Sequence, residues 1–186
     1  SHFLGAVEMR QIFAIGVGGT GAKCVEALVH LHACGLLAGD DGTPARLGVF
    51  LVEPDQQSAL LTRAQTAINR YGALKVAVGR NSDSFARSEL RDYGQWSPLT
   101  TSSGAISLDQ VFPKAVLRTQ AAGVAALFDC LFPPEEQQAD LEVGFRGRPP
   151  IGSAVMSRIN LQKEAQVGQW QQMLSDIQTA AGSGEP

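Results

Sequence analysis

The chain has 186 residues, of which 44% are hydrophobic and 18% charged, and its formal net charge at pH 7 is −3. This length and composition predict a globular domain with a sizeable core, while the mild acidity argues against a general field for nucleic acid or anionic membranes. No apolar run approaches the roughly 18 residues that a membrane span requires, so we expect a cytoplasmic protein with neither nucleic acid nor membrane as a partner.

The first predicted elements are a strand and a helix joined by glycines. Residues 12–15 form a brief apolar run that ends at glycine, which is typical of a short buried strand. Residues 22–33 show apolar side chains at helical spacing, and the shared face contains Val25, Leu28, Val29 and His32. Residues 47–55 then predict a second buried strand, and residues 58–71 a second helix.

This order of strand, glycine turn, helix, strand and helix is typical of an α/β fold. We therefore predict a Rossmann-like, mostly parallel sheet flanked by helices, with right-handed connections between its strands. Residues 9–181 form the predicted domain, which we expect to be incomplete. Residues 1–8 are interpreted as a tag or a disordered N-terminus, and residues 182–186 as a linker-like tail.

The remainder of the chain carries weaker signals. Residues 81–108 mix turn residues with single aromatic residues and are predicted to be irregular. One helix is predicted from Pro113 to residue 131, ending before two prolines, and a last helix has an apolar face that ends near Gly182. The three cysteines and three histidines lack metal-ligand spacing, so we expect no metal held by protein ligands alone, and thiols at least half-buried.

The glycines between the first strand and helix carry the main functional signal. Gly16, Gly18 and Gly21 have GxGxxG spacing, and Gly19 and Thr20 lie within it. Glycine lets the backbone turn sharply and approach phosphate oxygens, which the N–H groups and the positive end of the helix dipole then bind. The alternative is that the glycines only permit close packing of the strand against the helix.

Acidic residues at the end of the second strand are the next candidates. Glu53 and Asp55 are placed to bind a ribose or a metal ion. However, they lie further along the chain from the last glycine than the spacing of about 20 residues that is usual in Rossmann folds. An equally acceptable interpretation is that they cap the following turn and helix. Lys23 does not complete an ATPase phosphate loop, because Ala22 separates it from Gly21 and Cys24 follows it.

Three stretches together resemble the bacterial tubulin-like proteins, which are relatives of tubulin and FtsZ. They are IGVGGTGAKCVEALVHL, FLVEPDQQSALLTRAQ and VGFRGRPPIGSAVMSR. The resemblance implies a GTPase domain that binds GTP or GDP, with Mg²⁺, and acts through self-assembly or partner proteins in a bacterial multi-protein system. It implies that Gly16 to Gly21 touch the phosphates, that Glu53 or Asp55 lies near them or their metal, and that Arg146 lies near the nucleotide or an assembly contact.

The sequence also departs from that family. A second phosphate loop of GGGTGSG type and the catalytic loop that a neighbouring subunit supplies are both missing from it. If the resemblance holds, the chain is the N-terminal part of a longer protein, and alone it is expected to hydrolyse GTP hardly at all.

Two other classes of function stay open. Adenylating enzymes of the ubiquitin-activating type carry a similar glycine loop, and here Glu53, Asp55, Arg63 and Gln65 follow in roughly their order. Such an enzyme would bind ATP with magnesium, and Arg63 would steady the leaving pyrophosphate. The other class is a non-catalytic assembly module that retains the fold as an interaction surface.

Overall fold

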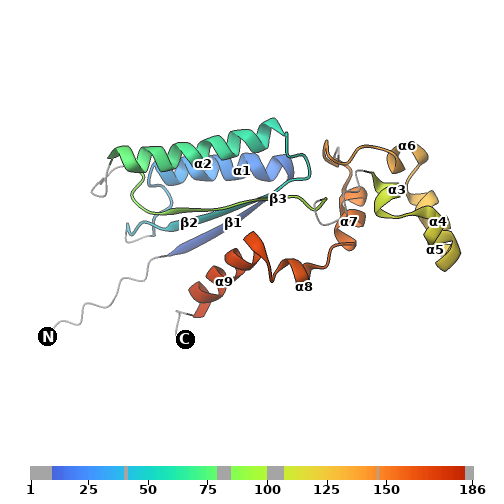
Figure 1. The fold of residues 1–186 in the computed structure, drawn as a ribbon. Coiled ribbons are helices and arrows are strands. Elements are labelled where there is room, and N and C mark those ends of the chain that lie inside the picture. Colours follow the sequence, from blue (N-terminus) through green and yellow to red (C-terminus); the bar gives the residue numbers. More distant parts are fainter. Residues whose placement is uncertain (1–9, 40–41, 79–84, 100–106, 146, 183–186) are drawn as a thin grey trace.

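A computed structural model describes residues 10–39, 42–78, 85–99, 107–145 and 147–182. The expected N-terminal tag and residues 183–186 of the expected tail lie outside these ranges. Figure 1 shows a sheet with helices on both faces and a group of short helices beyond one end of the strands.

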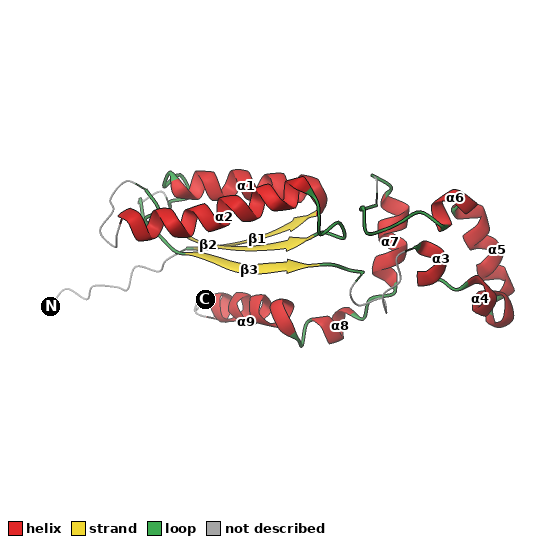
Figure 2. Ribbon diagram, turned by 45° about the horizontal axis from the view of Figure 1, so that its top comes forward, coloured by secondary structure: helices red, strands yellow, loops and turns green. Residues whose placement is uncertain are grey.

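The sheet confirms the predicted α/β architecture. β1 (Gln11–Val17), β2 (Arg46–Val52) and β3 (Leu90–Trp96) pair in parallel in the order β1-β2-β3. α1 (Gly18–Ala33) connects β1 to β2, and α2 (Ala59–Val78) connects β2 to β3. Figure 2 shows both helices on one face of the sheet, as in a Rossmann-like fold.

The helix-covered face holds the larger core. Side chains that alternate along β2 point into it, as expected for a strand buried on both faces. The predicted helical face of α1 is buried here, except that Leu28 is only partly covered. The buried members are Ala22, Val25, Val29, Leu47, Val49, Leu51, Leu61, Ala64, Ala67, Ile68, Tyr71 and Ala86.

The opposite face is covered by α9 (Gly168–Gly182), the helix predicted at the end of the chain. Phe50 is fully buried and meets the Trp170 ring edge to face, with ring centroids 4.7 Å apart. Trp96 lies 5.7 Å from Trp170 in a similar arrangement, and its Nε1 donates to a Glu164 carboxylate oxygen. Both tryptophans therefore belong to the core beneath the sheet.

β3 corrects the prediction that residues 81–108 are irregular. Gly94 has φ +83°, and the β2–β3 register shifts between Val49 and Leu51. This bulge allows Tyr93 and Trp96, three residues apart, to face the same side of the sheet. The strand therefore lacks the simple alternation by which a sequence pattern reveals a strand.

A helical unit lies between β3 and α9, beyond the carboxyl ends of the strands (Figure 1). It has its own core, formed by Leu99, Leu108, Val111, Phe128, Phe132, Leu141, Ile151 and Val155. Its helices are α3 (Leu108–Val111), α4 (Lys114–Gln120), α5 (Ala122–Leu131), α6 (Pro134–Gln137) and α7 (Pro149–Ser157), after which α8 (Leu161–Glu164) leads to α9.

The single helix predicted from Pro113 to residue 131 is wrong, because the chain forms α4 and α5 instead. Ala121 interrupts it with φ −155° and ψ 75°. The reversal brings Asp129 to Lys114, with 2.6 Å between carboxylate oxygen and Nζ, and also within 3.7 Å of Arg118. Tertiary contacts of this kind routinely override helix propensity.

The structure also bears on the cysteines and on membrane-spanning segments. Cys24, Cys34 and Cys130 are free and exposed, so the expectation of at least half-buried thiols is wrong. Within the described part of the chain, no helix combines the length and apolar character that crossing a bilayer requires.

His32 links the C-terminal part of α1 to the segment before β3. Its ring is buried, stacks on Tyr71 at 5.0 Å, and has Nε2 3.2 Å from the carbonyl oxygen of Glu89 and 3.3 Å from the Ser88 hydroxyl. Burial lowers the pKa of His32 below its ordinary value of 6.5, opposed by the Glu89 hydrogen bond and aided by the charge of Lys75.

We expect the buried His32 to make the folded state less stable in acid. Because the folded-state pKa is depressed, the unfolded chain binds the proton first as pH falls below the ordinary value, and the free energy of unfolding then decreases. Urea denaturation between about pH 8 and about pH 5.5 should show this decrease, and His32→Gln should reduce it. His30→Gln, at an exposed position of the same helix, should leave the decrease intact.

Candidate functional site

The candidate site lies at the carboxyl ends of the parallel strands, where ligands bind in open α/β sheets. β1 ends at Val17 and α1 begins directly at Gly18, so the glycines form the first turn of the helix. Val17 pairs with Val52, which places Gly18 beside Glu53 at the ends of adjacent strands. The glycine turn and the acidic residues are therefore brought together, as the sequence predicted.

Gly16 and Gly21 interlock the strand and the helix. A Cβ on Gly21 would lie 2.6 Å from the Gly16 carbonyl carbon, and a Cβ on Gly16 would lie 2.8 Å from the Gly21 oxygen. The atoms that obstruct Gly21 all belong to the backbone, which cannot move aside as a flexible side chain can, and Gly16 is obstructed by the Gly21 backbone and by Val25 Cγ2 at 2.7 Å. These two glycines are therefore required for packing, whether or not a ligand is bound.

Gly18, Gly19 and Thr20 form the accessible part of the turn. Gly18 has φ +68°, a conformation that favours glycine, and no atom lies within 4 Å of the position of a Cβ there. A Cβ on Gly19 would meet only the end of the Leu60 side chain, and Thr20 is exposed. The first N–H groups of a helix have no intrahelical acceptor. The N-cap residue Val17 makes no side-chain cap, and no acid occupies the first turn of α1.

Glu53 is the buried acid of the site, with 5% of its surface exposed. Its Oε1 accepts a hydrogen bond from the Asp55 amide at 3.2 Å. Burial raises the pKa of the Glu53 carboxyl, an effect that this hydrogen bond opposes and the charge of Asp55 reinforces. Glu53 thus presents a partly desolvated oxygen acceptor beside the glycine turn.

Asp55 takes the role of a turn cap. Its Oδ1 accepts from the Gln57 amide at 2.9 Å, and its carbonyl oxygen accepts from the Ser58 amide at 3.2 Å. These bonds shape the turn that leads into α2, which agrees with the capping interpretation. Among the described residues, only the Oδ1 oxygen of this carboxylate accepts a hydrogen bond.

A glutamine network fixes the same loop, and no sequence pattern indicates it because its members are far apart in the chain. Gln56 donates to the Glu53 carbonyl oxygen and accepts from Gln95 Nε2 at 2.7 Å, and Gln65 donates to Gln95. The network ties the loop after β2 to both α2 and β3. The loop that carries Glu53 is therefore held by hydrogen bonds within the loop, to α2 and to β3.

The helical unit also reaches the site. Gly144, with φ +85°, is so close that a Cβ there would lie 4.0 Å from Glu53 Oε1 and 3.9 Å from the Asp55 Cβ. The candidate Arg146 lies outside the described residues. Its neighbour Arg148 forms an ion pair with Glu136 within the helical unit. The segment before the Arg/Gly/Pro turn thus borders the acids.

Arg63 is engaged elsewhere. Its guanidinium forms an ion pair with Glu26 on α1, with 3.0 Å between Nη2 and Oε1 and a second hydrogen bond from Nε at 3.3 Å. This pair joins the exposed surfaces of α1 and α2. In this conformation Arg63 is not available to a phosphate at the glycine turn.

Comparisons with family models, curated proteins and solved structures give no match to this chain.

The arrangement suits an anionic ligand that also carries hydroxyl groups. Amides at the start of a helix suit phosphate oxygens, and the carboxylates of Glu53 and Asp55 can accept from ribose hydroxyls. Among the described residues, no group of three His, Cys, Asp or Glu side chains is placed to hold a metal ion. Mg²⁺ commonly binds through one or two carboxylates plus substrate phosphates, so Glu53 and Asp55 would hold it only together with a nucleotide.

Proposed function

We propose that this chain is a nucleotide-binding domain of the tubulin/FtsZ type, which binds GTP or GDP with Mg²⁺ and acts through nucleotide-dependent self-assembly or partner binding. The observation that carries the proposal is the open first turn of α1 at Gly18 to Thr20, with the buried Glu53 beside it. The choice of guanine rests on the sequence resemblance, because phosphates are common to all nucleotides.

The proposed binding mode assigns a role to each part of the site. The amides of Gly18, Gly19 and Thr20 bind phosphate oxygens, and the Thr20 hydroxyl adds a donor to phosphate or to a water on Mg²⁺. Glu53 binds the ribose or the metal ion, and Gly144 leaves room for the ligand by lacking a side chain. Gly16 and Gly21 hold the turn in the shape that makes this contact possible.

Thr20→Glu separates binding from folding and is the first test. Thr20 is the third residue of α1. A carboxylate at this position interacts favourably with the helix dipole and stabilises the helix by roughly 0.3–1 kcal/mol, while the same charge repels phosphate. We expect the variant to be at least as stable as the parent and to bind GTP about tenfold more weakly or worse. Titration calorimetry with GTP, ATP and NAD in the presence of Mg²⁺ measures the binding.

Ala27→Glu is the matched control, because it adds the same charge at an exposed position further along α1. It should leave GTP binding unchanged. Equal loss in both variants would show that net charge, and not the turn, governs binding. A preference of the parent chain for ATP would favour the adenylating class, although the engagement of Arg63 by Glu26 weakens that alternative.

The second candidate is a non-catalytic assembly module. It is favoured by the interlocked pair Gly16 and Gly21, since packing alone explains why neither can carry a side chain. It is also favoured by Ile15 and Val17, which are 44% and 65% exposed on β1, at an outer edge of the described sheet. A parent chain that binds none of the three nucleotides would support this candidate.

A further inference from the structure

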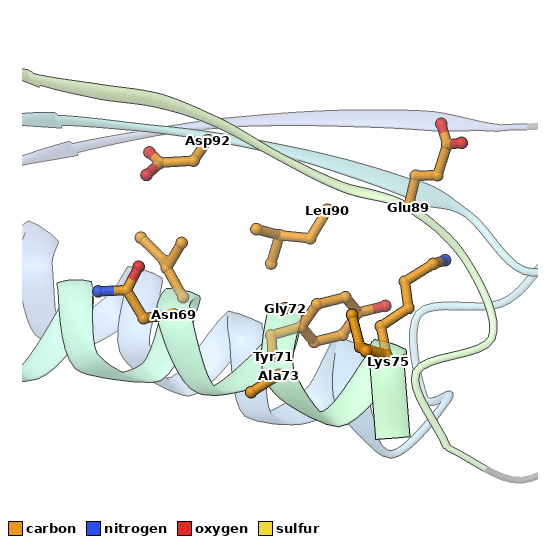
Figure 3. Close-up of a pocket in the computed structure, with 10 residues that line it drawn as sticks. Asn69, Tyr71, Gly72, Ala73, Lys75, Glu89, Leu90 and Asp92 are labelled. Carbon is orange, nitrogen blue, oxygen red and sulfur yellow. The ribbon is translucent and has the colours of Figure 1, made fainter. Parts of the chain in front are cut away.

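A cavity apart from the glycine turn lies between the C-terminal half of α2 and β3. It has a volume of about 650 Å³, and its lining is mainly apolar. Figure 3 shows Leu90 extending from β3 toward α2, with Tyr71 and Gly72 opposite it. Among the described residues, no atom outside the adjacent part of α2 lies within 4 Å of the position that a Cβ on Gly72 would take. Val76 is 84% exposed, so this part of the groove is open above the helix.

One wall of the groove is the outer edge of β3. The Leu47 amide donates to the Glu89 carbonyl oxygen at 3.0 Å, and Leu47 is paired with Leu90. In a parallel ladder, alternate residues of a strand bond to the same neighbour. The main-chain groups of Glu89 and Arg91 therefore face β2, and those of Leu90 and Asp92 face outward. No described strand pairs with this edge.

The charges around the groove are unequal in their availability. Lys75 donates to the Ser88 carbonyl oxygen with 2.5 Å between the atoms, and Glu89 lies 3.6 Å from the Arg46 guanidinium. Asp92 is exposed, accepts only from the Gly94 amide at 2.7 Å, and forms no ion pair within the described part of the chain. In Figure 3 its carboxylate lies at the end of the groove near Asn69. Lys75 and Asp92 therefore both lack an ion-pair partner among the described residues, and Asp92 is the acidic group that stays open to a basic side chain.

We propose that this groove binds an extended peptide segment of a partner protein, which joins β3 as an additional strand. Peptide addition of this kind uses main-chain hydrogen bonds for affinity and pockets for alternate side chains for specificity. The residue beside Leu90 places an apolar side chain over Gly72, and the residue beside Asp92, two positions away, carries a basic side chain. The groove and the glycine turn use different parts of the sheet, so this inference does not depend on nucleotide binding.

The test uses two acetylated and amidated peptides, TVTVTKT and its reverse TKTVTVT, which place valine and lysine two positions apart in either strand direction. Amide hydrogen exchange of the whole chain is followed by NMR with and without each peptide. We expect one peptide to slow exchange of the Leu90 and Asp92 amides about tenfold or more. The Arg91 amide, which already faces β2, should change little.

Two variants identify the groove as the binding site. Gly72→Leu fills the space above α2 and improves helix propensity by up to about 1 kcal/mol, so it should fold and weaken the peptide about tenfold or more. Gly123→Leu is the control, because Gly123 also lies in a helix with no atom near its Cβ position. Asp92→Lys should weaken the lysine peptide and favour TVTVTET or its reverse.

Unchanged exchange at Leu90 and Asp92 with millimolar peptide would overturn the proposal. So would equal weakening by Gly72→Leu and Gly123→Leu, because binding would then lie outside the groove. Protection of the two amides that rises with protein concentration in the absence of peptide would assign this edge to a second copy of the chain, and would also overturn it.

Discussion

Gly21→Ala is expected to lower the free energy of unfolding by about 3 kcal/mol or more, close to the upper end for overpacked sites. The added Cβ would lie 2.6 Å from the carbonyl carbon and 2.9 Å from the Cα of Gly16. Relief of this contact requires α1 to move away from β1, which would separate buried residues such as Ala22 and Val25 from the sheet. Urea denaturation followed by far-UV circular dichroism measures the loss.

Gly72→Ala is the matched control, because it makes the same chemical change inside a helix. No atom lies near the position of its Cβ, so the variant should gain up to about 1 kcal/mol from helix propensity. The two substitutions are therefore expected to have opposite signs. A Gly21→Ala chain as stable as the parent would show that the glycine turn can open without cost, and would remove the packing explanation of the motif.

This difference changes how the glycine motif is to be tested. Gly16 and Gly21 define the GxGxxG spacing, yet their substitution unfolds the contact between β1 and α1 before any ligand is considered. Loss of nucleotide binding in such a variant would say nothing about phosphate contacts. Thr20 is the informative position, because its side chain is exposed and its replacement by glutamate favours the helix.

The sequence was sufficient for the first half of the fold. Strong hydrophobic runs of β1 and β2 and the periodicity of α1 and α2 are local signals, and each predicted element is present. The boundaries moved: α1 begins at Gly18, four residues before the predicted start, and α2 continues to Val78. Glycine content hides the first helical turn from propensity arguments.

The second half depends on contacts between distant residues, which local patterns do not contain. β3 was missed because its bulge at Gly94 places Tyr93 and Trp96 on one face. The break between α4 and α5 falls at Ala121, a residue that ordinarily favours helix. The reversal accompanies the ion pair between Asp129 and Lys114, and that pair is visible only after folding.

Some features of the candidate site could likewise be predicted from the sequence, and others could not. The proximity of the glycine turn to Glu53 could be predicted, because parallel strands end at a common edge. The different roles of the two acids could not be predicted. They depend on the hydrogen bond from the Gln57 amide to Asp55 and on the burial of Glu53. The approach of Gly144 to Glu53 had no signal in local patterns, because it requires the helical unit to fold back on the sheet; only the resemblance implied that the neighbouring Arg146 lies near the nucleotide or an assembly contact.

Phe50→Ala is expected to cost about 3–5 kcal/mol, the range for a fully buried phenylalanine. Phe50 lies between the sheet and α9, where its ring meets the Trp170 ring. Its removal leaves a cavity beneath β2 and withdraws an aromatic contact from the helix that covers this face. The chain contains two tryptophans, and both belong to this cluster, so intrinsic fluorescence reports directly on it.

The fluorescence distinguishes local release of α9 from general unfolding. Under native conditions Phe50→Ala should shift tryptophan emission to longer wavelength, as Trp170 gains solvent, while far-UV circular dichroism keeps most of its helical signal. Phe85→Ala, at a phenylalanine that is 52% exposed, should cost under about 1 kcal/mol and leave the emission unchanged. If Phe50→Ala also left both the emission and the denaturation midpoint unchanged, α9 would not be the cover of this face in solution.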